Sequence, residues 1–200
     1  MSPRTEETNQ RIREEQKQRI LAAATTLFAH RGFSDTKMTD IAAAAEVSYG
    51  LAYHYFANKE EIFTRLVEWA LRGALHMVQR AMEQVGTPWD RIHWLTSQML
   101  TGLQGQPEID MVVIHALTND TVPPEIRELA LQQSDMIQDL LKRLIIEGQA
   151  AGQVVSGDPD RLATLFGSCI QGLALGRNTF FHNPPFSFPD TEDVLRILRA

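Results

Sequence analysis

Apolar residues recur every three or four positions along most of the chain, which is the spacing of one face of an α-helix. The stretches that carry this pattern are separated by glycines, prolines and capping residues. The pattern therefore predicts an all-α protein. The long helices are expected at residues 11–30, 59–85, 88–103, 124–150 and 159–181, with a short helix after Asp190.

One apolar segment is less clear than the others. Residues 109–117 are rich in β-branched side chains, which leaves a strand open as an alternative to a helix. The helical neighbours on both sides favour a helix here as well.

Two short helices fit between residues 36 and 59. The first has an apolar stripe formed by Met38, Ile41, Ala42 and Ala45. Ser48 is suited to cap the second, because its hydroxyl can accept a hydrogen bond from an unpaired backbone N–H. A helix, a tight turn and a second short helix is the arrangement that places its second member in the major groove of DNA.

The region from residue 17 to 65 carries an ordered set of residues: Gly32, Phe33, Thr36, Ile41, Ala42, Val47, Ser48, Gly50, Tyr53, Phe56, Asn58, Lys59 and Glu60. This set resembles the DNA-binding head of TetR-family transcriptional regulators. Three positions depart from the common pattern. Lys37 stands where Ser or Thr often caps a helix, Glu46 where glycine is usual in the turn, and Ala52 where a larger apolar residue is usual. Glu46 is expected to carry a left-handed strain of about 1 to 2 kcal/mol.

The resemblance implies a three-helix head over residues 1–58, with a flexible arm at 1–9, on a larger helical ligand-binding and dimerisation domain over 59–200. It also implies DNA contacts from the exposed side of the second short helix and its flanks. Hydroxyl groups there can donate to phosphate, glycine lets the backbone approach closely, and His54 is the best candidate for a base contact. The implied contacts are Thr39, Ser48, Tyr49, Gly50, Tyr53, His54 and Lys59.

The resemblance further implies a small-molecule cavity among the long helices of the body. Aromatic, soft or amphipathic side chains on those helices are candidates to line it, although ordinary core packing is the alternative for each of them. These candidates are Trp69, Met77, Trp94, Met99, Met111, His115 and Phe166. No charged residue stands out as an anchor, so an apolar or weakly polar effector is expected.

A row of small residues on the helix expected at 159–181 would allow another helix to approach closely. The row consists of Thr164, Ser168, Gly172 and Gly176. In the TetR family the last two long helices form the homodimer interface, and this row is similar in kind. Close packing inside one subunit is the alternative.

Net charge changes the picture only when it is divided along the chain. The whole sequence carries −6, but residues 1–59 hold eight Lys or Arg against seven Asp or Glu, and the acidic excess lies in the rest. A nearly neutral head attracts phosphate weakly, so DNA binding should depend on placed contacts and on pairing of two heads in a dimer.

Several other classes of protein do not fit the sequence. No run of 18 apolar residues is present, so no membrane span is expected, and the N-terminus has no apolar segment of a secretory signal. The single Cys169 excludes an internal disulfide, and neither metal-ligand spacing nor a phosphate loop is found. We expect a cytoplasmic protein without cofactor, metal or catalytic site.

Two functions remain. The first is a ligand-responsive transcriptional regulator, most often a repressor in the TetR family, that binds a palindromic double-stranded DNA operator as a homodimer and is released by a small molecule. The second is a helical protein-binding module that does not bind DNA.

Overall fold

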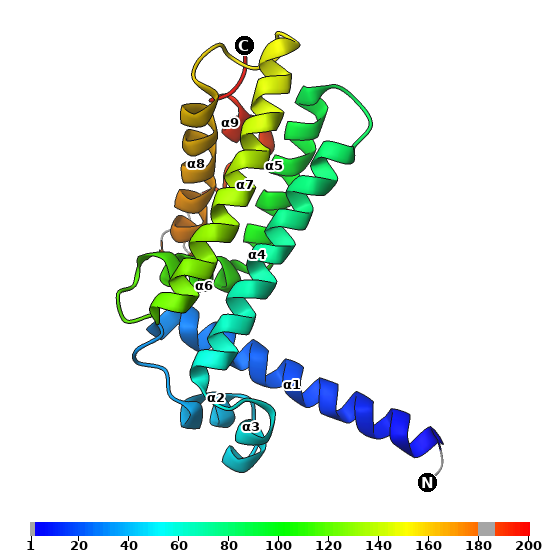
Figure 1. The fold of residues 1–200 in the computed structure, drawn as a ribbon, viewed down its shortest axis with the longest axis vertical. Helices are drawn as coiled ribbons and strands as arrows, with labels where there is room; N and C mark the ends of the chain where they lie inside the picture. The colour runs from blue at the N-terminus through cyan, green and yellow to red at the C-terminus, as the bar shows by residue number, and fades with distance from the viewer. Residues whose placement is uncertain (1–2, 180–186) are drawn as a thin grey trace.

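A computed structural model describes residues 3–179 and 187–200 of the chain. Within these residues it contains nine α-helices (Figure 1). The helices are α1 (Pro3–Arg31), α2 (Met38–Ala44), α3 (Tyr49–Tyr55), α4 (Lys59–Glu83), α5 (Pro88–Gly105), α6 (Pro107–Thr118), α7 (Pro124–Ala150), α8 (Pro159–Thr179) and α9 (Thr191–Leu195). The predicted all-α fold is confirmed.

Local capping signals place most helix boundaries where the sequence predicts them. Helices α7 and α8 begin at prolines 124 and 159, and α7 ends at Ala150 as predicted. The segment that could have been a strand is α6, because its apolar side chains pack against helices on several sides. The predicted end of α8 at Phe181 lies outside the described residues.

The first helix is longer than predicted. It begins at Pro3 rather than Arg11, so residues 3–9, expected to be part of a flexible arm, are helical. These turns project away from the molecule (Figure 1). The sequence of residues 3–9 contains no large apolar residue, which is why apolar spacing did not reveal them. None of the helices in the described ranges combines the length and the apolar content needed to cross a bilayer.

Two clusters of buried side chains hold the molecule together. The first joins α1, α2 and α3 to the start of α4 and to residues of α6 and α7, among them Val112, Ala116 and Ala130. The second fills the far end of the body, between α4, α5, α7, α8 and α9. On α4 the border between them falls between Leu71 and Val78. The proposed domain division at residue 58 therefore does not coincide with a break in the core.

Three phenylalanines form the centre of the first cluster. Phe63 of α4 packs edge-on against Phe28 of α1, with ring centroids 4.9 Å apart, and lies 5.1 Å from Phe33 in the turn after α1. Phe28 and Phe63 are fully buried. Since these rings come from α1, the following turn and α4, they fix the head against the first turns of α4.

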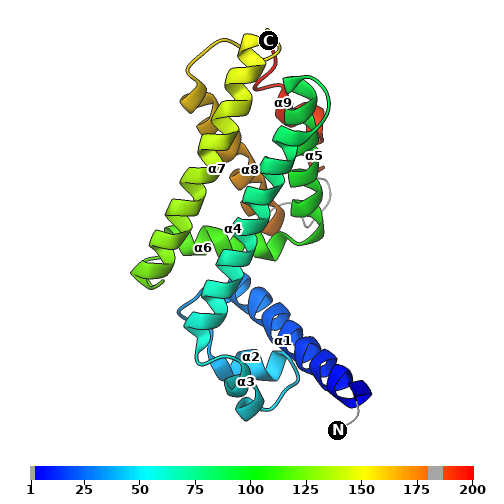
Figure 2. The same ribbon diagram turned by 45° about the vertical axis from the view of Figure 1, so that its right-hand side comes forward.

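In the body, α4 runs beside α7, and α7 beside α8, as both ribbon views show (Figures 1 and 2). Helix α6 lies across the lower end of this bundle, where it contacts α1. The C-terminal residues close the opposite end, where Val154 and Arg199 form a short antiparallel bridge. The body thus contacts the head through α4 and α6.

Replacing Phe63 by alanine is expected to lower the free energy of unfolding by about 3 to 5 kcal/mol, because it removes a buried ring between the head and the first turns of α4 and leaves a cavity. Urea denaturation followed by circular dichroism measures the change. Val85→Ala is the control, because Val85 is 99% exposed and its truncation should change stability by less than about 0.5 kcal/mol. Equal stability of the two variants would contradict the role of Phe63 in joining the head to α4.

Candidate DNA interface

Helix α3 packs against the head core with one face and exposes the other face to solvent. Ser48 caps it as predicted, since its hydroxyl accepts a hydrogen bond from the N–H of Leu51 at 3.2 Å. Ala52 is fully buried in the head core and Phe56 nearly so. A larger residue at Ala52, usual in related heads, would have to displace this packing. The opposite face of α3 is free to meet a ligand.

Five of the seven predicted DNA contacts lie together on that open face or at its edge. All are exposed: Ser48, Tyr49, Gly50, Tyr53 and His54. Thr39 is also exposed, at the start of α2. A side chain added at Gly50 would meet nothing within 4 Å inside the chain, so the backbone there is bare. These groups can reach a surface laid against α3.

Two tyrosines on this face form an ordered pair. Their rings pack edge to face with centroids 4.7 Å apart, and Tyr49 and Tyr53 remain 51% and 42% exposed. A side-chain hydrogen bond to Tyr49 is the main cause that raises the pKa of the Tyr53 phenol above its usual value. Tyr53 therefore keeps its proton near neutral pH, and rotation of the hydroxyl lets it donate that proton to another acceptor such as phosphate.

The turn before α3 contains the expected strain. Glu46 has a φ of 53°, the left-handed conformation that glycine adopts more easily. Its carboxylate lies 3.0 Å from the guanidinium of Arg19 on α1. Lys37 provides no side-chain cap for α2; instead the carboxylate of Asp40 accepts the N–H of Lys37. The helix pair thus keeps its geometry despite both departures from the family pattern.

Lys59, also predicted to meet DNA, is used inside the chain. Its ammonium donates to the carbonyls of Phe33, Ser34 and Thr36 at 2.7, 3.2 and 3.0 Å, and lies 4.4 Å from the centre of the Phe33 ring. An ammonium has three N–H donors, so these three carbonyls can occupy all of them. In this conformation Lys59 ties the start of α4 to the turn between α1 and α2, rather than presenting its charge to solvent.

The predicted cavity residues are not brought together as one set. Met77, Trp94 and Met99 pack against the second core cluster, of which Phe166 is a member, while Met111 is nearly buried in α6. Two others lie nearer the head: Trp69 and His115. Trp69 is 59% exposed on the outer side of α4. Ordinary packing, the alternative given for each, describes several of them.

His115 links the body to the head. Its Nε2 lies 3.2 Å from the carbonyl oxygen of Ala29 in the last turns of α1. A carbonyl can only accept, so this ring nitrogen carries the proton and donates. Because His115 belongs to α6, the bond joins a body helix to the first head helix. Sequence reasoning missed this partner, which is 86 positions away along the chain.

The structure also singles out a charged group in the body that the sequence did not. Asp110 of α6 stands within an apolar segment, and its burial raises the pKa of the carboxyl to about 6. The signal available in the sequence was one carboxylate between Ile109 and Met111. By contrast, Cys169 is a half-buried free thiol whose pKa is raised by burial. No group of His, Cys, Asp or Glu in the described residues could hold a metal ion.

The row of small residues on α8 is mostly on the surface. Thr164, Ser168 and Gly172 are exposed, whereas Gly176 is buried. Large apolar side chains are exposed on the same helix and on α7: Leu165, Leu175, Leu131, Met136 and Ile146. Packing inside one subunit therefore does not account for the first three positions of the row.

A comparison with known families decides what this head is. The family model for bacterial regulatory proteins of the tetR family matches residues 20–66, which include α2, α3 and the first turns of α4. The chain belongs to the TetR family. This TetR-family protein is a DNA-binding transcriptional regulator and not an enzyme. The alternative of a protein-binding module that does not bind DNA finds no support in this match.

Relatives of this TetR-family regulator match beyond the head. The uncharacterized HTH-type transcriptional regulator YfiR of Bacillus subtilis is 28% identical over 147 residues, which cover 73% of this chain and 70% of YfiR. The structure of the MbdR regulator from Azoarcus sp. CIB has a TM-score of 0.81 at 20% identity, over 92% of this chain and 97% of that one. The structure of AibR in complex with isovaleryl coenzyme A and operator DNA has a TM-score of 0.70 at 20% identity, over 90% and 94%. At these identities the two structures show the fold alone.

Replacing Lys59 of the TetR-family head by alanine is expected to lower the free energy of unfolding by about 2 kcal/mol, because three carbonyls lose a charged donor. Thermal and urea unfolding measure the loss. Lys142→Ala is the matched control, since Lys142 makes a surface ion pair with Asp160 and should cost less than about 1 kcal/mol. If Lys59→Ala unfolds like the unmodified chain, the three hydrogen bonds of Lys59 make no net contribution to stability.

Proposed function

We propose that this regulator is a homodimeric repressor that binds a palindromic operator and is released by a small molecule. The observation that carries the proposal is the open face of α3, on which two phenols, a serine hydroxyl, an imidazole and a bare glycine stand together. On the opposite side, the fully buried Ala52 and the nearly buried Phe56 at the end of α3 hold that set in a fixed orientation. Such a face suits the major groove, where backbone contacts position a helix and base edges specify the sequence.

Each group on this face has a distinct role in the proposal. Tyr49, Tyr53 and Thr39 donate to phosphate oxygens on either side of the groove, while Ser48 stays engaged as the cap of α3 and can still approach a phosphate. Gly50 allows the backbone to come close. His54, exposed on the last turn of α3, reads a base edge. Lys59 acts indirectly, by fixing the turn that precedes α2.

A single head has little general attraction for DNA, because its charges nearly cancel. Two heads held by a symmetric dimer would read two half-sites about one helical turn, or a multiple of it, apart. The exposed apolar residues of α7 and α8 and the small residues Thr164, Ser168 and Gly172 support a dimer interface on this side of the body. Small residues let two helices approach, and the leucines around them would lose water on pairing.

Release by an effector requires that the body and the head move together. The effector site is proposed among the body helices around Met77, Trp94, Met99, Met111 and Phe166, with Asp110 as a titratable group on α6. AibR, whose structure contains both isovaleryl coenzyme A and operator DNA, supports the idea that this fold can serve both ligands. A ligand that prefers a body conformation with displaced heads would lower the affinity of the protein for DNA. Bound DNA would lower the affinity of the protein for that ligand by the same factor.

Removing the hydroxyl of Tyr53 is expected to weaken operator binding. Loss of about 1 kcal/mol of hydrogen bonding in each protomer amounts to about 30-fold for a dimer. Fluorescence anisotropy with palindromic DNA from upstream of the gene measures it, at several salt concentrations. Tyr55→Phe is the matched control, because the Tyr55 hydroxyl donates to Gln16 within the head at 2.7 Å. Equal affinity of Tyr53→Phe and the unmodified protein would remove Tyr53 from the contacts.

Replacing Gly172 by leucine tests the dimer. A side chain at this position meets nothing within 4 Å inside the subunit, so the fold should be preserved while an approaching partner helix is blocked. The expected result is a monomer by light scattering, with unchanged circular dichroism and weaker operator binding. If the variant keeps the mass of a dimer, the interface does not include the exposed row of α8. If the unmodified protein is itself a monomer, the proposed dimer is wrong.

A further inference from the structure

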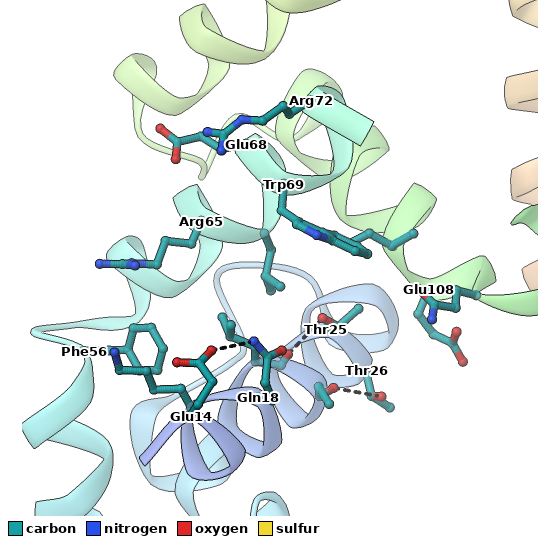
Figure 3. A pocket seen from close by; sticks show the side chains of 16 residues that line it. Glu14, Gln18, Thr25, Thr26, Phe56, Arg65, Glu68, Trp69, Arg72 and Glu108 are labelled. Carbon is teal, nitrogen blue, oxygen red and sulfur yellow. Dashed lines mark hydrogen bonds between the residues drawn. The ribbon is translucent and has the colours of Figure 1, made fainter. Parts of the chain in front are cut away.

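A groove of about 670 Å³ lies at the junction of the head and the body, outside the proposed effector region (Figure 3). Residues of α1, α4 and α6 line it. Its volume is within the range of about 300 to 1,000 Å³ that is usual for small-molecule sites. The proposed DNA contacts of α3 do not take part in it.

On the α4 side of the groove, Trp69 stands between two arginines along the helix. Arg65, Trp69 and Arg72 are spaced by four and three positions, which places them in one row along the helix. Trp69 is 59% exposed, whereas the other two tryptophans of the chain are half-buried. An indole left open in a groove offers a flat apolar surface on which another ring can stack.

The α1 side of the groove has short side chains at its C-terminal end. Ala22, Thr25 and Thr26 line it there, beyond four longer residues, and both threonine hydroxyls donate to carbonyls of their own helix. Their oxygen atoms keep free acceptor positions, but their protons are already used. The close-up shows Trp69 on the α4 side and the two threonines on the α1 side (Figure 3). This arrangement leaves room for a planar group.

The charges that line the groove limit the ligand. Three basic side chains, Lys17, Arg65 and Arg72, face three acidic ones, Glu14, Glu68 and Glu108. This balance disfavours a ligand with several charges of one sign.

Several charged groups of the groove have no ion-pair partner within the described residues. Arg65 is held by Glu61, at 2.9 Å, whereas Lys17, Arg72 and Glu68 have none. On the acidic side, Glu14 accepts a hydrogen bond from Gln18, and Glu108 lies in the first turn of α6, where the helix dipole stabilises it. Of the two basic groups without a partner, Arg72 is the one next to Trp69, three positions further along α4, and its guanidinium can pair with a single carboxylate in a bidentate geometry.

We propose that this groove is a second small-molecule site, separate from the effector site in the body, and that it takes a planar aromatic monocarboxylate. The ring stacks on Trp69 and the carboxylate pairs with Arg72. Because α1, α4 and α6 all line the groove, its shape changes when the head moves relative to the body. A bound acid thereby favours one head orientation and is coupled to DNA binding by linkage.

The test uses 2-naphthoate as the probe and the full-length chain labelled with ¹⁵N. The three tryptophan indole N–H signals are followed by NMR during titration, and Trp69→Phe assigns the signal of Trp69. We expect 2-naphthoate to shift the Trp69 signal in a saturable way and Trp69→Ala to remove that binding. Arg72→Gln should weaken naphthoate binding about fivefold while leaving the weaker binding of the neutral 2-naphthamide unchanged.

Arg80→Gln is the matched control, because it removes the same charge from the same helix outside the groove, beside Trp94. It should leave naphthoate affinity at Trp69 unchanged. The proposal is overturned if naphthoate shifts only the Trp89 or Trp94 signals, if Arg72→Gln and Arg80→Gln have equal effects, or if 2-naphthylmethylammonium binds at Trp69 as tightly as the acid. None of these outcomes depends on operator binding, so they leave the proposed repressor function to its own test.

Discussion

The packing of Phe63 between Phe28 and Phe33 is the contact on which the rest of the structure depends. It places a ring of α4, the first helix of the body, at the centre of the head core, with centroid distances of 4.9 and 5.1 Å. The same buried cluster extends to Val112 of α6 and Ala130 of α7. A close-packed core of this kind resists gradual deformation, so the head cannot turn on α4 without repacking it. The exposed face of α3 is therefore oriented by the body.

Much of the fold could be predicted from the sequence because its signals are local. Ser48 accepts a backbone N–H at the start of α3, as its residue type and position indicated. Asn58 and Asp190 do the same at the starts of α4 and α9. The prolines at 124 and 159 mark two further starts in the same way. A capping bond joins residues three positions apart, so composition and spacing contain all the information it needs.

The parts that the sequence could not provide are contacts between distant segments. Lys59 was expected to contact DNA, but its hydrogen-bond partners lie 23 to 26 positions away, in the turn between α1 and α2. His115 was expected in a cavity, and its partner on α1 is 86 positions away. Periodicity tells which face of a helix is apolar, but not which element covers it. For the same reason the small row of α8 was visible in the sequence, whereas its exposure at Gly172 was not.

Three separate contacts now hold the end of α1 and the turn that follows it. Phe63 and Lys59 hold it from α4, and His115 holds it from α6. Because α4 and α6 belong to the same body, a ligand that changes their relative position cannot leave all three contacts in their present geometry. Helix α6 also packs along α1, and its Val112 and Ala116 are fully buried in the same cluster as Phe63. A change between α4 and α6 must therefore repack at least one of two buried contacts of α1, which couples the orientation of the head to the arrangement of these two helices.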